Sequence, residues 1–440
     1  MRKMKRLWVC MLSIAVLLVG ISIPAAGGIT LRVTDWQAGC GIGMINSINQ
    51  IIDLFEQSHP GVKIEYQQYT APTYPEFLFP SIAAENAPDV FAIYPGPDLA
   101  TVVQAAPENM VPISDIWDED WKRWLGRAGE FLGGTVNGKL WIASLDAQTE
   151  CIWVYKDLFE ECGVEVPALG VPLTVDTLID MVEPANQLGY DLLTAGFMEP
   201  WVVHGYYFNA VHQLQPTDTP DMLLQAFNGE ISWQQDMFAL PIQAFAKMHN
   251  AHVWKEESLN IDYQVSSVER WVSKKAIGLW ANGDWFVTAV DEYIPEENTP
   301  DNPNVVTIMY PLVNEDATPA YNWGFGTNFG INGKGAHVEL ATEFVRTFST
   351  PAAAQIMVKN GVVPAASGAL DVTALGSTGN PIFDECIELF CGLEGRASTY
   401  VYPYPEANDV LYTGVMDVML GAASIDDVLA ALDEVCGYGG

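Results

Sequence analysis

The chain has 440 residues and a formal net charge of −35, with 49% hydrophobic and only 17% charged residues. This composition excludes a disordered polyanion or a coiled coil, and the length predicts two or three domains with cores of their own. Because acidic residues outnumber basic ones so strongly, no basic surface is left to bind nucleic acid or anionic lipid. Functions at nucleic acid or at a membrane surface are therefore set aside.

Residues 1–28 have the pattern of a secretory signal peptide. Four basic residues precede an apolar run at 7–23, and small residues follow that run. The run is short for a bilayer span, so an uncleaved anchor is the less favoured alternative, and no lipoprotein cysteine follows it. Cleavage near Gly27 or Gly28 removes four positive charges and takes the net charge from −35 to −39. The mature protein is predicted to be exported to the periplasm or the extracellular space.

The N-terminal third alternates between strand and helix periods. The expected elements are a strand at 31–35, a helix at 44–55, a strand at 62–67, a helix around 75–86 and a strand at 89–93. This order predicts a largely parallel sheet with helices on both faces. Ligands in such sheets bind beyond the carboxyl ends of the strands, which indicates 35–39 and 94–98.

Turn and cap signals mark the later elements. Asn137-Gly138 between apolar residues predicts a tight hairpin. The acidic, proline-rich stretch 292–304 is expected to be a surface loop, and 341–348 carries the apolar face of a late helix. Ser424, with Asp427 three residues on, predicts the cap of a final helix.

Six cysteines remain after cleavage of the leader: Cys40, Cys151, Cys162, Cys386, Cys391 and Cys436. An even number in an exported chain allows disulfides, and buried free thiols are the alternative. No Cys-x-x-Cys pair occurs, so no zinc site is predicted. The sequence calls for no cofactor.

Two glycine-rich stretches resemble nucleotide-binding loops but lack necessary residues. The stretch 133–139 has the spacing of a phosphate loop, yet Leu140 stands where a magnesium-binding hydroxyl is needed. The glycines at 39–43 have part of a dinucleotide-binding motif, but Met44 occupies the position of its third glycine. Glycines there are better explained by a close approach of ligand or backbone.

Hydrolysis of a glycosidic bond stays open at this point. A glycosidase needs two carboxylates that flank the bond, and Asp146, Glu150 and Glu199 lie near aromatic residues. Because the chain has 55 acidic residues, proximity in sequence distinguishes none of them.

Several segments carry, in this order along the chain, a resemblance to one family: 51–66, 87–91, 136–141, 154–167, 275–285, 341–364 and 421–429. The chain resembles the extracellular solute-binding proteins of ABC importers, in the sugar-binding group that includes maltose-binding protein. The resemblance implies a two-lobed α/β fold with a hinge that the chain crosses several times and a ligand cleft between the lobes. Lobe 1 would hold 29–145 with about 323–350, and lobe 2 would hold 146–322 with about 351–440.

The family's function implies a monomer that binds a sugar or oligosaccharide, passes it to membrane permease subunits and catalyses no reaction. A secreted glycosidase or polysaccharide-binding protein, or a binding protein for a cation such as a polyamine, are the alternatives. Scarce Lys and Arg with abundant Trp favour a neutral sugar, which needs flat aromatic platforms and planar hydrogen-bonding groups. Carboxylates with aromatics also cage cations, which keeps the polyamine alternative open.

The resemblance also implies which residues contact the ligand. Glu199 and Trp201 match an acid-Pro-aromatic element, and Trp285 matches the tryptophan of the cleft, where Gly283 is expected to permit a tight turn. Gln148 stands where maltose-binding protein has an acid, which argues against maltose. The full set of candidates is Trp36, Tyr94, Asp98, Gln148, Glu199, Trp201, Asn282, Trp285, Trp323 and Tyr404.

Overall fold

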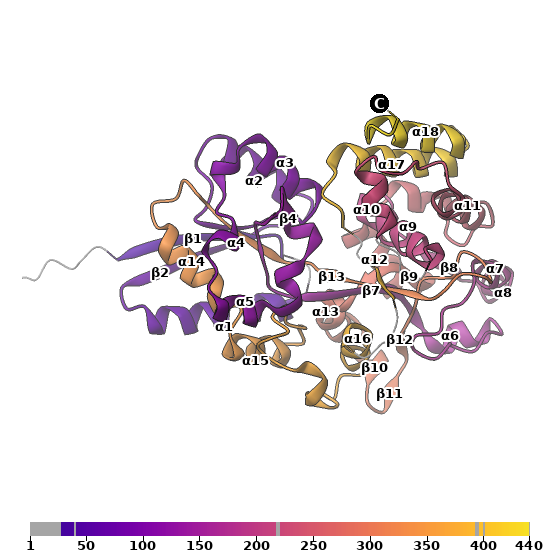
Figure 1. Ribbon diagram of the computed structural model, residues 1–440. Helices are drawn as coiled ribbons and strands as arrows, with labels where there is room; N and C mark the ends of the chain where they lie inside the picture. Colours follow the sequence, from indigo (N-terminus) through magenta and orange to yellow (C-terminus); the bar gives the residue numbers. More distant parts are fainter. Residues whose placement is uncertain (1–27, 39–40, 217–220, 392–395, 399–400, 440) are drawn as a thin grey trace, which may run out of the picture.

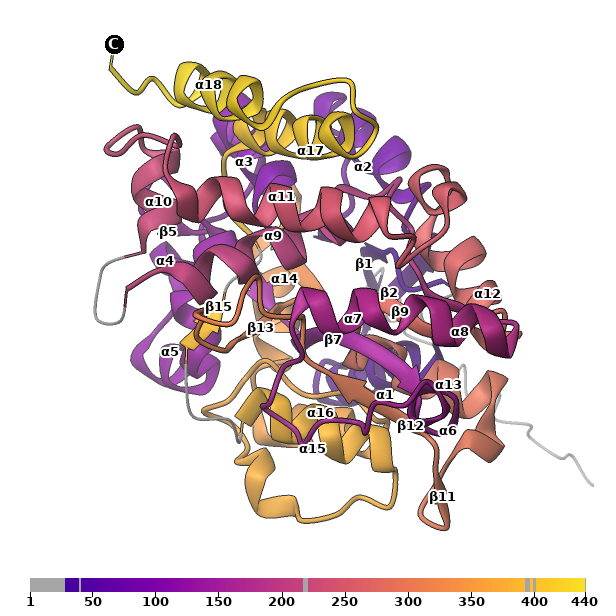
Figure 2. The ribbon, with the colours of Figure 1, turned by 90° about the vertical axis from the view of Figure 1, so that its right-hand side faces the viewer.

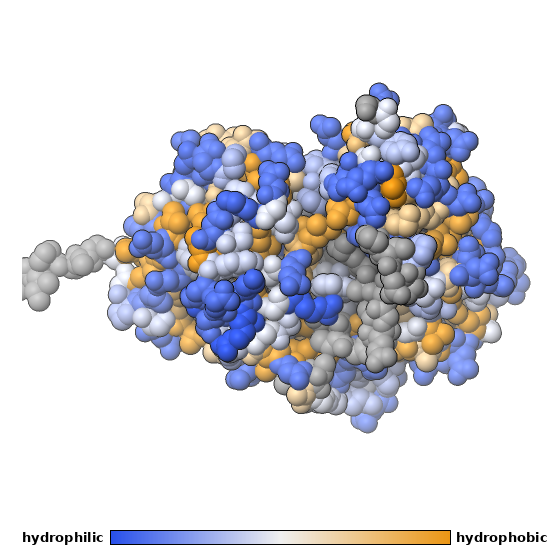
Figure 3. All heavy atoms as spheres, viewed as in Figure 1, coloured by the Kyte–Doolittle hydropathy of each residue, from blue (hydrophilic) through white to orange (hydrophobic). Residues whose placement is uncertain are grey.

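The fold was determined as a computed structural model, which describes residues 28–38, 41–216, 221–391, 396–398 and 401–439. Two lobes lie side by side, each built on its own β-sheet (Figure 1). A space-filling view from the same side shows hydrophilic residues spread over both lobes (Figure 3). The predicted signal peptide, except for Gly28, lies outside the described residues.

The sheet of lobe 1 has the strand order β2-β1-β3-β14-β6. Its members are β1 (Ile29–Asp35), β2 (Val62–Gln68), β3 (Val90–Ala92), β6 (Ala143–Ser144) and β14 (Asn328–Ile331). The first three strands are parallel, as their periods predict, whereas β14 runs antiparallel to both of its neighbours. A strand from late in the sequence thus completes a sheet that the N-terminal third begins.

Helices on both faces cover this sheet. They are α1 (Ile42–Ser58), α2 (Tyr74–Ala83), α3 (Pro97–Ala105), α4 (Ile113–Ile116), α5 (Glu119–Leu125), α14 (Val338–Thr347) and α15 (Pro351–Lys359). Figure 1 shows α2 and α3 above the sheet and α1 and α15 below it. The predicted hairpin is β4 (Thr135–Val136) with β5 (Lys139–Leu140), and both Asn137 and Gly138 have positive φ in its turn.

The sheet of lobe 2 is mostly antiparallel. Its strands are β15 (Arg396–Ser398), β13 (Ala320–Phe325), β7 (Ala147–Tyr155), β9 (Ala276–Gly283) and β8 (Asp191–Thr194) in spatial order, with β12 (Val305–Ile308) also paired to β7. Nearly every residue of β7 and β9 is buried. Strands that are buried along nearly their whole length need helices on both faces of the sheet.

Those helices surround the second sheet on two sides. They are α6 (Lys156–Glu161), α7 (Val175–Asp180), α8 (Val182–Leu188), α9 (Pro200–Leu214), α10 (Met222–Phe227), α11 (Asp236–Asn250), α12 (Val268–Val272), α13 (Val287–Tyr293), α16 (Pro381–Cys391), α17 (Pro405–Met419) and α18 (Ile425–Val435). Figure 2 shows α9 and α11 on one side of the sheet and α16 on the other. The predicted cap of the last helix is confirmed, because Ser424 and Asp427 form a capping box at the start of α18.

The stretch 292–304, which was expected to be a surface loop, is largely exposed but contains regular structure. This stretch contains a small hairpin, β10 (Asn298–Thr299) with β11 (Asn302–Pro303). Asn298 is buried because its amide nitrogen donates to Asp291 at 2.8 Å and to Asn380 at 2.9 Å. Composition gave the polar character of the segment but not these long-range partners.

Three backbone segments run side by side between the sheets. Leu145 N donates to Thr327 O at 2.8 Å, Ala147 N donates to Val363 O at 2.9 Å, and Ala365 N donates to Leu145 O at 2.8 Å. The chain thus returns from β13 to β14 at 326–327. The predicted lobe boundaries stay a prediction. Helix α15, which falls in the range predicted for lobe 2, packs on α1 of lobe 1.

Cys151, Cys162, Cys386 and Cys436 are free thiols. Cys40 lies outside the described residues, and the side chain of Cys391 is not described. Disulfides are therefore excluded only among the four cysteines that the structure describes as free.

Candidate ligand-binding site

Four predicted side chains of lobe 2 come together with a fifth that the sequence did not indicate. Glu199 and Trp201 lie at the start of α9. Asn282 is the last residue but one of β9, and Trp285 follows in a short 3-10 helix. Tyr263, which begins a π-helix (Tyr263–Ser267), is the fifth. We call these five residues the lobe 2 cluster.

Hydrogen bonds fix the orientation of each group in the lobe 2 cluster. Trp201 Nε1 donates to Glu199 Oε2 at 2.6 Å, and Tyr263 N donates to Glu199 Oε1 at 3.2 Å. Trp285 Nε1 donates to the Tyr263 hydroxyl at 3.1 Å, and that hydroxyl donates to Asn282 Oδ1 at 2.5 Å. The carboxylate and the phenol thus position the two indoles.

The aromatic rings of the lobe 2 cluster stand nearly at right angles. Trp201 and Trp285 have centroids 5.8 Å apart with an interplanar angle of 84°, and Trp201 meets Tyr263 at 4.8 Å and 75°. Both indoles are partly exposed, whereas Tyr263 and Asn282 are buried beneath them. Burial raises the pKa of Glu199, and its hydrogen bonds from Trp201 and Tyr263 oppose that shift.

A bulge in β9 aims Asn282 and Trp285. The register of β7 against β9 shifts between Cys151 and Trp153, and Ala281 on the facing strand has φ of 58°. Such a conformation is strained for a residue with a Cβ, and strain of this kind is concentrated at functional sites.

The expectation that Gly283 permits a tight turn is wrong. Its φ is −154°, an extended conformation that any residue adopts. A Cβ at this position would instead collide with Thr149 O and with the Trp285 ring. Glycine is needed here because backbone and indole approach it closely.

Trp36 and Tyr94 form a second aromatic pair, in lobe 1. They follow β1 and β3, two neighbouring parallel strands, and their rings stack at 4.0 Å and 15°. Gln264 of the π-helix donates to Ala38 O at 3.4 Å, two residues after Trp36. The lobe 1 pair and the lobe 2 cluster therefore lie on facing sides of the boundary between the lobes.

Gln148 lies near the start of β7, beside the segments that connect the two sheets. Its amide nitrogen donates to Asp146 Oδ2 at 2.9 Å, and Asp146 Oδ1 accepts from Thr327 N at 2.6 Å. Burial raises the pKa of Asp146 to about 6. Gly326 has no room for a Cβ, since it would fall on the Gln148 side chain.

The other carboxylates considered for hydrolysis are held in internal networks. Glu150 is buried in lobe 2, where Tyr310 donates at 2.8 Å and Asn322 at 3.0 Å to its two oxygens. Burial raises its pKa to about 7. Asp146 and Glu150 thus have oxygens engaged with protein donors.

Three further candidates lie apart from the lobe 2 cluster. Trp323 on β13 carries the Arg127 guanidinium over its ring at 4.0 Å. Tyr404 stacks on Phe227 at 4.9 Å and donates to Asn228 Oδ1 at 2.5 Å. Asp98 lies in the first turn of α3, where that helix meets α17. Their roles stay predictions.

Sequence reasoning missed Tyr263. It directly follows Asp262, whose carboxylate accepts from Val265 N at 2.7 Å and from Ser266 N at 3.3 Å and so caps the π-helix. An acidic residue directly before an aromatic residue is a weak signal of a binding site, and this pair does not predict a π-helix.

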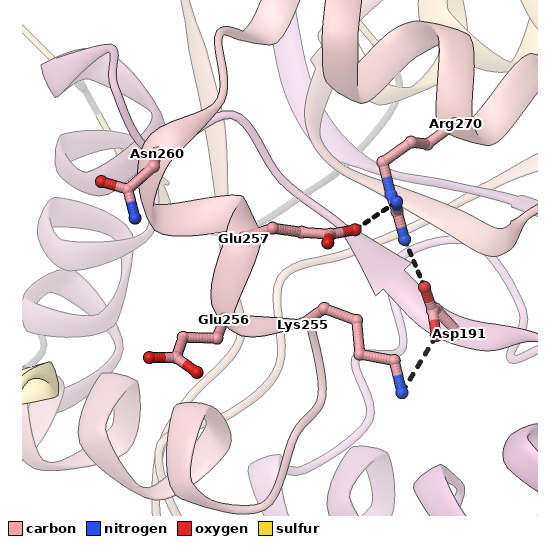
Figure 4. Close-up of a pocket in the computed structure, with 6 residues that line it drawn as sticks. All are labelled: Asp191, Lys255, Glu256, Glu257, Asn260 and Arg270. Carbon is pink, nitrogen blue, oxygen red and sulfur yellow. Dashed lines mark hydrogen bonds and ion pairs between the residues drawn. The ribbon is translucent and has the colours of Figure 1, made fainter.

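A separate hollow of about 620 Å³ lies in lobe 2 beside β8 (Figure 4). Both of its basic groups are paired with acids, because Arg270 bridges Glu257 and Asp191 while Lys255 pairs with Asp191 at 3.1 Å. The hollow lacks an aromatic lining, so it does not suit a sugar.

Within the described residues, no group of three or more His, Cys, Asp or Glu side chains could hold a metal ion. The same part of the chain contains no helix that is both long and apolar enough for a membrane span.

Residues 42–355 match the family model for bacterial extracellular solute-binding proteins. The chain belongs to this family. Its membership confirms the resemblance that the ordered segments indicate. No curated protein sequence matches the chain.

Solved structures of low sequence identity share the fold of this solute-binding protein. One, from work on xylan utilization by Caldanaerobius polysaccharolyticus, has a TM-score of 0.75 at 17% identity and covers 92% of this chain and 99% of its own. A chitin oligosaccharide binding protein has a TM-score of 0.72 at 15% identity, and the match covers 93% of this chain and 98% of that protein. An ABC transporter solute-binding protein from Thermotoga lettingae, bound with α-D-tagatose, has a TM-score of 0.70 at 17% identity. The match covers 93% of this chain and 100% of that protein. The predicted two-lobed α/β fold is confirmed.

Proposed function

We propose that this solute-binding protein binds a neutral sugar or oligosaccharide between its lobes and delivers it to the permease of an ABC importer. The observation that carries the proposal is the lobe 2 cluster, in which two partly exposed indoles are fixed at right angles beside a carboxylate. Closing the lobes brings the Trp36–Tyr94 side toward this cluster and encloses the ligand.

The chemistry of the cluster suits a sugar. The C–H faces of a pyranose ring stack on indoles, and its equatorial hydroxyls donate to carboxylate oxygens. Glu199 and the two indoles supply these groups, with no Lys or Arg among the five residues. Phosphorylated or sulfated sugars lack a cationic partner in this cluster.

Structural relatives support the same ligand class. Their names include a chitin oligosaccharide binding protein, a protein in complex with raffinose and one bound with α-D-tagatose. Since identities are 15–17%, these likenesses support a class of ligand and leave the individual sugar open.

We further propose an exported monomer without catalytic activity. The ligand contacts would be Glu199, Trp201, Asn282 and Trp285 from lobe 2 with Trp36 and Tyr94 from lobe 1. Gln148, Trp323 and Tyr404 would contact only a ligand long enough to extend beyond these six residues.

A melting-temperature screen of the mature protein against raffinose, tagatose, and chitin, xylan and malto-oligosaccharides tests the proposal. We expect at least one sugar to raise the melting temperature and to bind saturably in calorimetry. Chromatography of the recovered sugar should show it unaltered. Turnover of the sugar would instead support a glycosidase, and stabilisation by spermidine alone would contradict a sugar ligand.

A further inference from the structure

One acidic side chain of each lobe lies on the helices α3 and α17, which pack against each other. Helix α3 follows β3 of lobe 1, whereas α17 packs on α9, α11 and α18 of lobe 2. Figure 2 shows α3 beside α17. Asp98 lies in the first turn of α3, and Asp409 lies on α17.

The start of α3 approaches lobe 2 closely. A Cβ at Gly96 would lie 3.2 Å from Tyr402 O and would overlap the Val401 side chain. Asn408 Nδ2 donates to that same Tyr402 carbonyl at 3.0 Å. Asp98 and Asp409 are thus near neighbours of a tight contact between the lobes.

The surroundings of Asp98 offer its charge little compensation. Asp98 is partly buried, whereas Asp409 is exposed. Among the described residues, none donates a hydrogen bond to the Asp98 carboxylate and none forms an ion pair with it. Burial first and the charge of Asp409 second raise the pKa of Asp98 to about 6. The positive end of the α3 dipole opposes this shift without cancelling it.

The other elements packed against α3 bring no positive charge to Asp98. The short 3-10 helix Pro107–Asn109 carries Glu108 at the opposite end of α3, and β4 carries no titratable side chain. On the lobe 2 side the titratable neighbours of Asp409 are Tyr402, Tyr404, Glu406 and Tyr412. His204 of α9 also faces this contact, because its Nε2 lies 3.2 Å from Asn408 O. Burial lowers the pKa of His204 to about 4, so its imidazole is neutral at pH 5 and above. The titratable groups named at this contact are therefore acids, phenols and a neutral imidazole.

We propose that Asp98 and Asp409 make lobe closure sensitive to protons, because closure buries the Asp98 carboxylate beside the charge of Asp409 and so disfavours the closed state until Asp98 is protonated. The proposal rests on the proposed function in one respect, that closure encloses the ligand. It assigns Asp98 to the contact between lobes instead of to the ligand.

The direction of the effect follows from linkage. With the lobes apart, Asp98 is exposed to water and its pKa returns toward the ordinary 3.8. The closed state therefore takes up a proton as the pH falls below about 6, and a ligand that requires closure binds more tightly there. Between pH 7.5 and pH 5 we expect roughly a tenfold gain in affinity.

Calorimetric titration with raffinose, or with whichever sugar of the panel binds, provides the first test. Wild type should bind roughly tenfold more tightly at pH 5 than at pH 7.5. Asp98→Asn should bind tightly at both values, and Asp409→Asn should bind more tightly than wild type at pH 7.5. Asp53→Asn, which neutralises an exposed acid of α1, is the matched control and should keep the wild-type dependence on pH.

Two results would overturn the proposal. If the Asp98→Asn variant retains the full pH dependence of binding, that dependence comes from other buried acids. Asp98→Asn that binds more weakly than wild type at both pH values would make Asp98 a ligand contact.

Small-angle X-ray scattering without ligand separates this proposal from the proposed function. Wild type should have a smaller radius of gyration at pH 5 than at pH 7.5, and Asp98→Asn should have the smaller value at both. This expectation holds even if no panel sugar binds. Equal radii for wild type at the two pH values would contradict the proton-sensitive closure.

Discussion

Trp285 is the side chain on which the proposed site depends most. Its indole is partly exposed, hydrogen-bonded to Tyr263 and set at 84° to Trp201. If it stacks on the sugar, Trp285→Ala should weaken binding by about 2–4 kcal/mol, or roughly 30-fold to 1000-fold. Calorimetry with the sugar identified by the screen measures this loss, and the melting temperature should change little.

Trp280→Phe provides the matched control. Trp280 lies in the same strand region but is fully buried in the core of lobe 2, against Tyr206, Trp254 and Tyr310. Its replacement should lower the melting temperature and leave the affinity near that of wild type. A Trp285→Ala variant that behaves in the same way would place Trp285 in the core and outside the site.

Tyr263 should affect binding through its neighbours. Tyr263→Phe removes the hydroxyl that accepts from Trp285 Nε1 and donates to Asn282 Oδ1. We expect affinity to fall by about 1–2 kcal/mol, or roughly 5-fold to 30-fold, because the indole and the amide lose a fixed orientation. Tyr207→Phe, which removes a 3.0 Å hydrogen bond to Phe238 O, is the control and should bind like wild type. Equal losses in the two variants would argue against a positioning role for Tyr263.

At the scale of the element, the bulge of β9 connects the sheet to the site. Ala281 has positive φ and no exposed surface, so a β-branched side chain fits neither its backbone nor its packing. Ala281→Val should therefore lower both stability and affinity, whereas Ala281→Gly should keep the bulge and bind like wild type. Thermal melts and calorimetry compare the two variants. A Val variant with wild-type values would show that the bulge is not needed.

Elements with local signals were predictable from the sequence. The alternation of 62–67, the helical spacing of 44–55 and the Ser424 cap depend on neighbours a few residues away, and the structure has β2, α1 and α18 there. The hairpin at β10 and β11 was missed because its order depends on Asp291 and Asn380. The antiparallel β14 also comes from pairing between residues more than 200 positions apart.

The candidate site was predictable in part, because the family resemblance indicates four of its five residues. Asn282 and Trp285 stand in a segment that carries the family resemblance, and Glu199 and Trp201 match the acid-Pro-aromatic element that the resemblance implies. The structure brings the four side chains together. Tyr263 was missed because its contribution is a hydrogen bond made by the fold of a π-helix. The bulge was missed because the residue with positive φ is Ala281, whereas Gly or Asn usually marks this conformation.

At the scale of the whole molecule, buried acids should control how stability depends on pH. Burial raises the pKa of Asp35, Glu150 and Glu385 to about 7 each. The folded state then holds more protons than the unfolded state between about pH 4 and pH 7. The free energy of unfolding must therefore fall as the pH rises through this window. The net charge of −35 acts in the same direction, since like charges repel more strongly when every acid is ionised.

We expect the melting temperature to be higher at pH 5 than at pH 8, measured at constant ionic strength. Each of the three acids should contribute on the order of 1–3 kcal/mol across the window. Glu385→Gln isolates one of them, because Glu385 Oε2 accepts from Thr307 N at 2.8 Å and from Thr307 Oγ1 at 3.0 Å, and an amide oxygen can replace it. The variant should melt with a shallower dependence on pH and should gain most at pH 8, where the wild-type carboxylate is ionised and buried. A melting temperature that rises from pH 5 to pH 8 would show that paired, low-pKa carboxylates dominate instead, as Glu56 with Lys63 and Asp118 with Arg346 do locally.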